Sequence, residues 1–279
     1  MSVDDIIDGI ISFGRGALMA KFDIESAYLI VPVHPEDRFL LGMCWKDNFF
    51  VDLALPFGLR SAPFIFMTIT DLLTWILQHN YYVGFIKHYL DDFHTVGPPN
   101  SPQCSINLAT CNHLFAVWGV PLHPDKLEGL STTLTVLGIE LDSLALQARL
   151  PQEKFVRIIG LLDTWLSEKH CKRRELESLI SHLHHACKVV PQGRTFLLRM
   201  INLLAAFRKD DHPIRLNNDF HLDLSWWQDF FHSYDGTSFF LSPQWARLPD
   251  FQVSSDAAGT LGYGAIFDRE WFAGSWSSA

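Results

Sequence analysis

The alternation of strand-like and helical segments over residues 1–148 restricts the fold of this chain more than any other feature of its sequence. Apolar residues repeat at helical spacing from Phe64 to Leu77, and a second amphipathic segment covers residues 104–118. Strand-like runs lie on either side of each helix. These runs cover residues 20–33, 83–97 (two short strands) and 134–150. Residues 39–55 alternate around Lys46-Asp47-Asn48, which predicts a hairpin. The order strand, helix, strand pair, helix, strand is typical of an antiparallel sheet with two helices on one face, which predicts an α+β fold.

Three acidic residues lie at strand ends that such a sheet brings together. Asp23 lies in the first predicted strand segment, and Asp91 and Asp92 form the turn between the two strands of residues 83–97. Neighbouring carboxylates repel one another unless a cation lies between them, and their oxygens are ligands that Mg²⁺ prefers. An isolated Asp-Asp pair is more often a polar hairpin turn. The pair therefore indicates a metal site only if Asp23 lies beside it.

The composition predicts a globular chain with no membrane-spanning segment. Apolar residues make up 48% of the chain, but no apolar run approaches the roughly 18 residues that a membrane helix needs. Asp4 and Asp5 lie where a secretory signal would be basic, so we expect an intracellular protein, cytoplasmic or nuclear. Five scattered cysteines without a C-x-x-C pair favour neither a disulfide framework nor a zinc site.

A basic segment divides two acidic ones. The net charge is −9, yet residues 149–209 hold 12 Lys/Arg against 5 Asp/Glu, and their apolar spacing is helical. Such a segment suits contacts with nucleic-acid phosphates. The alternative is that these charges form the solvated face of amphipathic helices, and the charge pattern alone favours that alternative.

Five short motifs follow one another along residues 21–139. They are K-F-D-I-E-S-A-Y (Lys21–Tyr28), L-P-F-G-L-R-S-A-P-F-I-F (Leu55–Phe66), Y-L-D-D (Tyr89–Asp92), G-V-P-L (Gly119–Leu122) with Lys126, and L-G-I (Leu137–Ile139). In this order and at this spacing, they resemble the motifs of reverse transcriptases from retrotransposons. The stretch from His182 to Val190 resembles DIRS-type elements, and Gypsy-type elements, which share L-P-F-G, are the alternative.

The resemblance implies a division of the chain into four parts. These are a polymerase palm with partial fingers (residues 1–148, fingers at about 34–55), a helical thumb (149–209), a connector (210–248) and the start of a ribonuclease H-like fold (249–279).

The resemblance also implies the catalytic residues. Asp23, Asp91 and Asp92, with the carbonyl of Ile24, would hold two Mg²⁺ ions, for which Mn²⁺ could substitute. Two metal ions of this kind promote nucleotide transfer from a dNTP to the 3′-hydroxyl of a primer paired to an RNA or DNA template.

Other positions match residues that bind the nucleotide or the duplex. Tyr28 matches an aromatic gate that excludes ribonucleotides, Phe57 and Gly58 match the lining of the nucleotide pocket, and Lys126 matches a lysine near the triphosphate. The thumb contacts with the duplex would come from Lys169, Lys172, Arg173 and Arg174.

Asp256 matches the first catalytic aspartate of ribonuclease H, but the sequence ends before the other carboxylates, so we expect no ribonuclease H activity. Two alternatives to a reverse transcriptase remain open. One is a non-catalytic nucleic-acid-binding remnant of a retroelement, because few residues precede Asp23. The other is a different palm polymerase, such as an RNA-dependent RNA polymerase, which Tyr28 disfavours.

Overall fold

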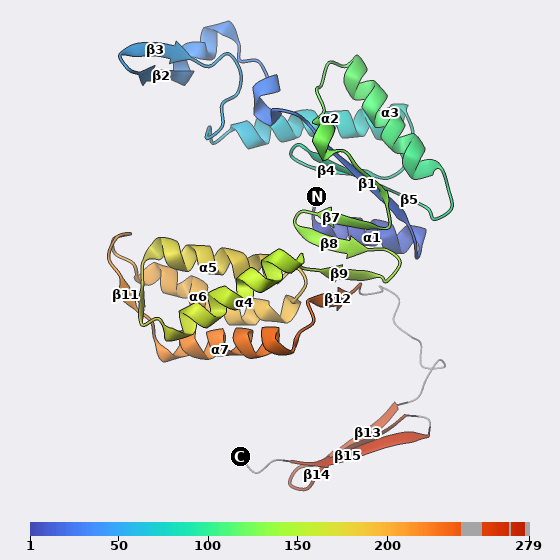
Figure 1. Ribbon diagram of the computed structural model, residues 1–279, viewed down its shortest axis with the longest axis vertical. Helices are drawn as coiled ribbons and strands as arrows, with labels where there is room; N and C mark the ends of the chain where they lie inside the picture. Colours follow the sequence, from blue (N-terminus) through green and yellow to red (C-terminus); the bar gives the residue numbers. More distant parts are fainter. Residues whose placement is uncertain (241–252, 268, 277–279) are drawn as a thin grey trace. The chain divides into compact units, whose positions relative to one another are not determined.

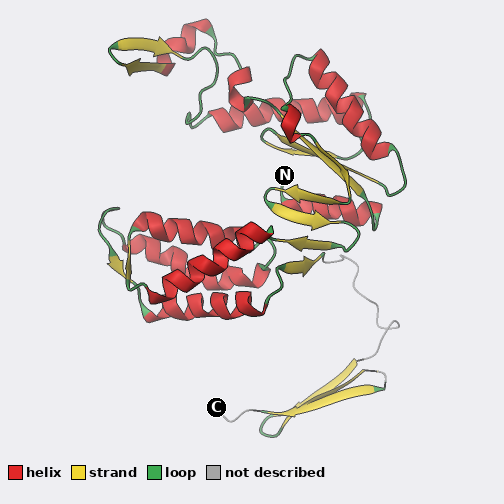
Figure 2. Cartoon of the chain, viewed as in Figure 1, coloured by secondary structure: helices red, strands yellow, loops and turns green. Residues whose placement is uncertain are grey.

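A computed structural model of the chain describes residues 1–240, 253–267 and 269–276, which belong to two compact units (Figure 1). The first unit, Met1–Phe240, contains helices and strands, whereas the second, Leu241–Ala279, has only strands among its described residues (Figure 2). Within the described residues, no helix is long and apolar enough to cross a membrane. Helices combined with antiparallel strands confirm the predicted α+β class.

A four-stranded antiparallel sheet forms the centre of the first unit. In spatial order, its strands are β4 (Ile86–Tyr89), β5 (Asp92–Gly97), β1 (Leu18–Asp23) and β6 (Glu128–Ser131). β1 and β5 pair along their full lengths, from Leu18 opposite Gly97 to Asp23 opposite Asp92. This sheet is the antiparallel arrangement that the order of segments predicts, with β6 as an additional edge strand.

Two helices cover one face of this sheet, as predicted. α2 (Ala62–Asn80) contacts β4, and α3 (Gln103–Val117) contacts β5 and β1. The ring of Phe115 in α3 packs against those of Phe22 and Phe93 in the sheet, with the three centroids 5.1 to 5.4 Å apart. Aromatic rings at this spacing add to the hydrophobic stabilisation of the sheet.

The opposite face is covered by α1 (Val3–Phe13), which has no counterpart in the predicted order of segments. Ile6 and Ile10 of α1 are buried in one apolar core with Met19 of β1. Met19 and Phe22 are an odd number of residues apart on β1, so their side chains lie on opposite faces. Ser2 and Asp5 form a capping box that fixes where α1 begins.

The predicted hairpin around residues 46–48 is confirmed. β2 (Gly42–Trp45) and β3 (Asn48–Val51) pair with each other alone, and Lys46 and Asp47 both have positive φ, as a tight two-residue hairpin turn requires. Two short 3₁₀ helices, η1 (Ala27–Ile30) and η2 (Pro35–Leu41), precede the hairpin, and a third, η3 (Pro124–Lys126), precedes β6.

A second sheet joins the strand-rich part of the unit to its helices. Its spatial order is β12 (Thr237–Phe239), β9 (Gln147–Arg149), β8 (Ile139–Asp142) and β7 (Thr133–Val136). β7 and β8 meet at Leu137 and Gly138, both of which have positive φ.

The helical part of the unit begins at α4. Its elements are α4 (Gln152–Ser167), α5 (Arg173–Ala186), η4 (Pro191–Leu197), α6 (Leu198–Leu203), η5 (Leu204–Ala206) and α7 (Asn218–Ser233), with a small β10 (His170–Cys171) and β11 (Ile214–Arg215) pair.

The segment that we expect to be a connector instead folds into the helical bundle. α7 packs against α4, and its buried residues Phe220, Leu224, Trp227 and Phe231 recur every three to four positions. The aromatic and acidic composition of this segment conceals that spacing. Its most buried acid, Asp223, forms an ion pair with Arg199 of α6.

The second unit contains a three-stranded antiparallel meander. Its strands are β13 (Val253–Ala258), β14 (Gly262–Phe267) and β15 (Glu270–Ser275). These three strands lie within residues 249–279, the segment predicted to begin a ribonuclease H-like fold. Residues 249–252, where the predicted ribonuclease H-like segment begins, lie outside the described residues.

Candidate functional site

The three predicted metal-binding aspartates meet at one end of the first sheet. Asp23 is the last residue of β1 and is paired directly with Asp92, the first residue of β5. Asp91 precedes Asp92 in the tight turn from β4, and its carbonyl accepts a hydrogen bond from the Ile24 amide at 3.0 Å. Leu90 has a φ of 55°, which lets the chain reverse direction within two residues. Antiparallel pairing thus places side chains from distant parts of the sequence together.

The charges at this end of the sheet are close enough to affect one another. Burial raises the pKa of Asp91 above its usual value, and the negative charges of Asp23 and Asp92 raise it further. Asp23 is itself 7% exposed. A cation near these groups would therefore favour their ionised forms.

Lys126 supplies one such cation. Its Nζ lies 3.0 Å from Oδ2 of Asp23, and this hydrogen bond raises the pKa of the lysine. The segment before Lys126 is tied to the end of β1, because the Glu25 amide donates to the Pro121 carbonyl and the His123 amide to the Asp23 carbonyl, both at 2.9 Å. The backbone thus fixes Lys126 within reach of Asp23.

The donors at this site suit a hard divalent cation, because all three side chains are carboxylates. Among the described residues, however, no three His, Cys, Asp or Glu side chains are arranged so that they could hold a metal ion. A metal ion would therefore need side-chain movements at Asp23, Asp91 and Asp92, including release of Asp23 from Lys126.

A histidine that sequence reasoning missed lies beside the aspartates. The His94 Nε2 lies 3.7 Å from Oδ2 of Asp92. The imidazole is 1% exposed, and neither ring nitrogen has a hydrogen-bond partner among the described residues. In the register of the sheet, His94 lies opposite Lys21 of β1 and Lys87 of β4. The available signal was its position two residues after Asp92, which places both on one face of β5.

The predicted gate residue lies in a small aromatic cluster. The Tyr28 ring is 5.1 Å from that of Phe57 and 5.3 Å from that of Phe66 in α2, measured between centroids. Phe57 remains 65% exposed, so it can offer a face to a ligand. Gly58 has a φ of 90°, which favours glycine. The structure therefore brings Tyr28 and Phe57 together.

The basic residues predicted to contact a duplex lie at the far end of α4 and the start of α5, where acids accompany them. Arg173 pairs with Glu177 at 2.8 Å and with Asp210 at 3.7 Å. Arg174 lines a groove together with Glu168 and Glu175. The Lys172 amide donates to Glu175, and the Lys169 carbonyl accepts from the Leu216 amide. Their role as phosphate contacts stays a prediction.

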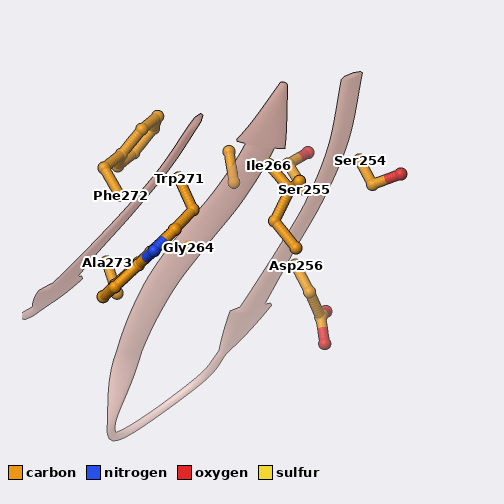
Figure 3. A pocket seen from close by; sticks show the side chains of 9 residues that line it. Ser254, Ser255, Asp256, Gly264, Ile266, Trp271, Phe272 and Ala273 are labelled. Carbon is orange, nitrogen blue, oxygen red and sulfur yellow. The ribbon is translucent and has the colours of Figure 1, made fainter. Parts of the chain in front are cut away.

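Asp256 lies on β13 of the second unit, opposite Gly264. Its Oδ1 accepts a hydrogen bond from the Ala257 amide at 2.8 Å. In Figure 3 its carboxylate points away from the ring of Phe272, and it is the one acid among the described residues that line this pocket. Within the described part of this unit, no group of acids accompanies it in a metal-holding arrangement.

Comparison with known proteins finds a family resemblance in the first half of the chain. Residues 10–141 match the family model described as reverse transcriptase (RNA-dependent DNA polymerase). The genome polyproteins of two Petunia vein clearing virus isolates, Shepherd and Hohn, are 36% identical to this chain over 52 residues, which cover 19% of the chain. Polyprotein P3 of Commelina yellow mottle virus is 29% identical over 131 residues, or 46% of the chain. The matches span only 2% and 6% of those polyproteins.

Solved structures show that the resemblance extends to the fold of most of the chain. The foamy viral protease-reverse transcriptase dRH in complex with double-stranded DNA matches 94% of this chain, and 42% of that chain is covered, with a TM-score of 0.60 and 16% identity. The foamy viral protease-reverse transcriptase in complex with an RNA/DNA hybrid matches 96% of this chain, with 35% of that chain covered, a TM-score of 0.58 and 13% identity. The chain thus has the fold of viral reverse transcriptases.

Proposed function

We propose that this chain is the polymerase core of a retroelement reverse transcriptase, which transfers a nucleotide from a dNTP to the 3′-hydroxyl of a primer paired to an RNA or DNA template. One observation carries the proposal. Asp23 and Asp92 are direct cross-strand partners, and Asp91 lies in the adjoining turn. Residues 10–141, which match the reverse transcriptase family model, contain all three.

In this proposal each part of the chain has a role. The first sheet with α2 and α3 is the palm, the hairpin of β2 and β3 belongs to the fingers, and the bundle of α4 to α7 is the thumb. The meander of the second unit is the start of a ribonuclease H-like fold. Among the described residues that line its pocket, Asp256 is the only acid, and we expect polymerisation without ribonuclease H activity.

The carboxylates of Asp23, Asp91 and Asp92, with the carbonyl of Ile24, would hold two Mg²⁺ or Mn²⁺ ions. When bound, such ions activate the primer hydroxyl and neutralise charge on the triphosphate. Lys126 is 53% exposed, although its ammonium contacts Asp23. That ammonium can therefore turn from the carboxylate to the triphosphate oxygens of an incoming nucleotide.

Tyr28, Phe57 and Gly58 would bind the sugar and base of the incoming dNTP. The Tyr28 ring packs against Phe57 and Phe66, which restricts its rotamers. A fixed ring beneath the sugar leaves no room for a 2′-hydroxyl. Gly58 has a positive φ and no side chain, which lets the backbone approach the ligand.

The similar foamy viral enzymes were solved with double-stranded DNA and with an RNA/DNA hybrid, which supports a duplex partner for this chain. We further propose that the element is DIRS-type, on the sequence from His182 to Val190, with Gypsy-type as the alternative.

A non-catalytic remnant is the second candidate, favoured by the Lys126–Asp23 contact and by carboxylates that are not gathered around a metal position. Primer extension on a DNA-primed RNA template with Mg²⁺ and dNTPs distinguishes the two. We expect extension by the unmodified chain and none by Asp91→Asn. Asp8→Asn, which makes the same charge change on the exposed face of α1, is the control and should extend normally. If the unmodified chain gives no extension at any Mg²⁺ or Mn²⁺ concentration, the polymerase proposal is wrong and the non-catalytic remnant is supported.

A further inference from the structure

His94 of β5 lies inside the protein with both of its ring nitrogens unpaired. The imidazole is 1% exposed, and among the described residues neither Nδ1 nor Nε2 has a hydrogen-bond partner. A buried polar group without a partner costs free energy, and most such groups in folded proteins are paired. An unpaired imidazole at this position therefore indicates an acceptor that comes within reach when the neighbouring site is in use.

The residues beside His94 in the sheet cannot be that acceptor. Lys21 of β1 and Lys87 of β4 lie opposite it, and an ammonium group only donates hydrogen bonds. The Lys21 Nζ is also held elsewhere, because it lies 3.1 Å from the Glu128 carboxylate and donates to the Thr135 carbonyl at 3.2 Å. The acceptor for His94 must therefore come from its own strand or from beyond the sheet.

Asp92 is the acceptor within reach. Its Oδ2 lies 3.7 Å from the His94 Nε2, and among the described residues it is the only acid within ion-pair distance of this histidine. The two residues are two positions apart on β5, so their side chains lie on one face. The gap is too long for a hydrogen bond, but a movement of about 1 Å would close it.

The Asp92 carboxylate is free to make this movement. It is 32% exposed, and it accepts no hydrogen bond from any described residue. Divalent-cation binding requires the carboxylates of Asp23, Asp91 and Asp92 to move in any case. A hydrogen bond to one oxygen of Asp92 would fix the orientation of the carboxylate and leave its other oxygen for the cation.

We propose that His94 is a positioning residue for Asp92. In this proposal, the His94 Nε2–H donates to the Asp92 carboxylate when that carboxylate takes part in binding a divalent cation. His94 itself touches neither the cation nor the substrate. The inference rests on the proposed function, because it needs the three aspartates to act as a metal site. It adds a buried residue whose contribution is the direction in which one carboxylate points.

A second buried histidine in the same sheet provides a matched control. His88 of β4 is 7% exposed, and its Nε2 lies 2.9 Å from Oδ1 of Asp71 in α2. The His88 ring stacks on Phe93, with centroids 5.1 Å apart. Phe93 and Asp92 are adjacent on β5, so their side chains lie on opposite faces. His88 therefore shares the burial of His94 but lies away from Asp92.

Electron paramagnetic resonance of free Mn²⁺ tests the proposal. The full chain is titrated with Mn²⁺ without nucleotide or nucleic acid, so that turnover cannot affect the result. Asp91→Asn identifies the binding that belongs to the aspartates. His94→Leu removes both ring nitrogens at similar volume, whereas His94→Gln keeps an N–H donor. His88→Leu makes the same change on the opposite face of the sheet.

We expect His94→Leu to weaken the Asp91-dependent Mn²⁺ affinity by about tenfold or more, as for the loss of a residue that orients a metal ligand. His94→Gln should stay within about threefold of the parent protein and His88→Leu within about twofold, because neither removes that donor.

Two results would overturn the inference alone. They are parent-like Mn²⁺ affinity in His94→Leu, and an equal loss of affinity in His94→Gln and His94→Leu. If the parent protein shows no Mn²⁺ binding that Asp91→Asn removes, the proposed metal site fails and the role of His94 fails with it. The two kinds of failure are therefore distinguishable.

Thermal melting without Mn²⁺ separates positioning from a role in the fold. His94→Leu should melt no lower than the parent protein, because it replaces an unpaired buried imidazole with an apolar side chain. His88→Leu should melt lower, because it removes the contact with Asp71. If His94→Leu loses Mn²⁺ affinity but melts as low as His88→Leu, His94 supports the fold and does not position Asp92.

Discussion

At the scale of single residues, Asp91 shows how function opposes stability. Burial and the charges of Asp23 and Asp92 raise its pKa above the ordinary value of 3.8. Its folded form therefore holds a proton more tightly than its unfolded form. The protonated Asp91 carboxyl therefore stabilises the folded state. This stabilisation is fully present below pH 3.8 and is lost as the pH rises through the raised pKa of the folded state. At neutral pH, the ionised carboxylate opposes folding.

We therefore predict that Asp91→Asn raises the melting temperature at pH 7 by a few degrees in the absence of divalent metal, although it abolishes primer extension. Asparagine keeps the size of the side chain but has no charge to desolvate. Differential scanning calorimetry between pH 4 and 8 measures the effect, and the gain should shrink toward pH 4. A lower melting temperature than that of the parent protein at pH 7 would contradict it.

A second residue-scale prediction concerns sugar selection. Tyr28→Ala should admit ribonucleotides, lowering the ratio of kcat/KM for dNTP over rNTP by at least about tenfold, because the ring that restricts the 2′ position is gone. Single-nucleotide incorporation kinetics measure the ratio. Tyr28→Phe keeps the ring and should keep the selectivity. Loss of selectivity in Tyr28→Phe would mean that the hydroxyl rather than the ring excludes the ribose.

At the scale of elements, the sequence predicts those strands, helices and turns that depend on local residue patterns. The hairpin of β2 and β3 follows from its turn residues, and the pairing of Asp23 with Asp92 follows from the order of strands and helices. The sequence places His94 on the same strand face as Asp92, but the burial of its imidazole is evident only in the fold. The bundle contacts of α7 depend on residues far away in sequence.

The part played by α7 gives an element-scale prediction. Trp227 is fully buried and lies against Gly193, where an added Cβ would be 2.1 Å from its ring. Trp227→Ala should lower the free energy of unfolding by about 3–5 kcal/mol, as measured by urea denaturation. Trp75→Ala on α2 removes the same side chain from a position that is 53% exposed and should cost far less. Equal losses would mean that α7 does not belong to the core of the bundle.

At the scale of the whole molecule, the distribution of charge is more informative than the net value of −9. The aspartates gather at one end of a sheet, whereas several basic side chains, Lys154 and Arg157 among them, line a pocket between α4 and α5. A surface of this kind can hold cations and phosphates at the same time. The basic segment was evident from the sequence, but which of its residues lack acidic partners required the fold, since Glu177 and Asp210 neutralise Arg173 only in three dimensions.

The cysteines test the integrity of the first unit. Cys44 is exposed, and the other four are buried. Burial raises the pKa of Cys104, Cys171 and Cys187 to about 11 and that of Cys111 to about 12. A thiol reagent at pH 8 should therefore modify one cysteine quickly and the others only on unfolding. Cys44→Ser should remove the fast phase, and a second fast thiol would show that part of the buried core is open.

The central claim is that Asp23, Asp91 and Asp92 act together as a metal site. The most direct measurement is anomalous diffraction from crystals grown with Mn²⁺, a primer–template duplex and a non-hydrolysable dNTP. We expect anomalous density between the carboxylates of Asp23 and Asp91, with Lys126 released from Asp23. Ordered duplex and nucleotide without manganese at these carboxylates, and with the Lys126–Asp23 pair intact, would contradict it.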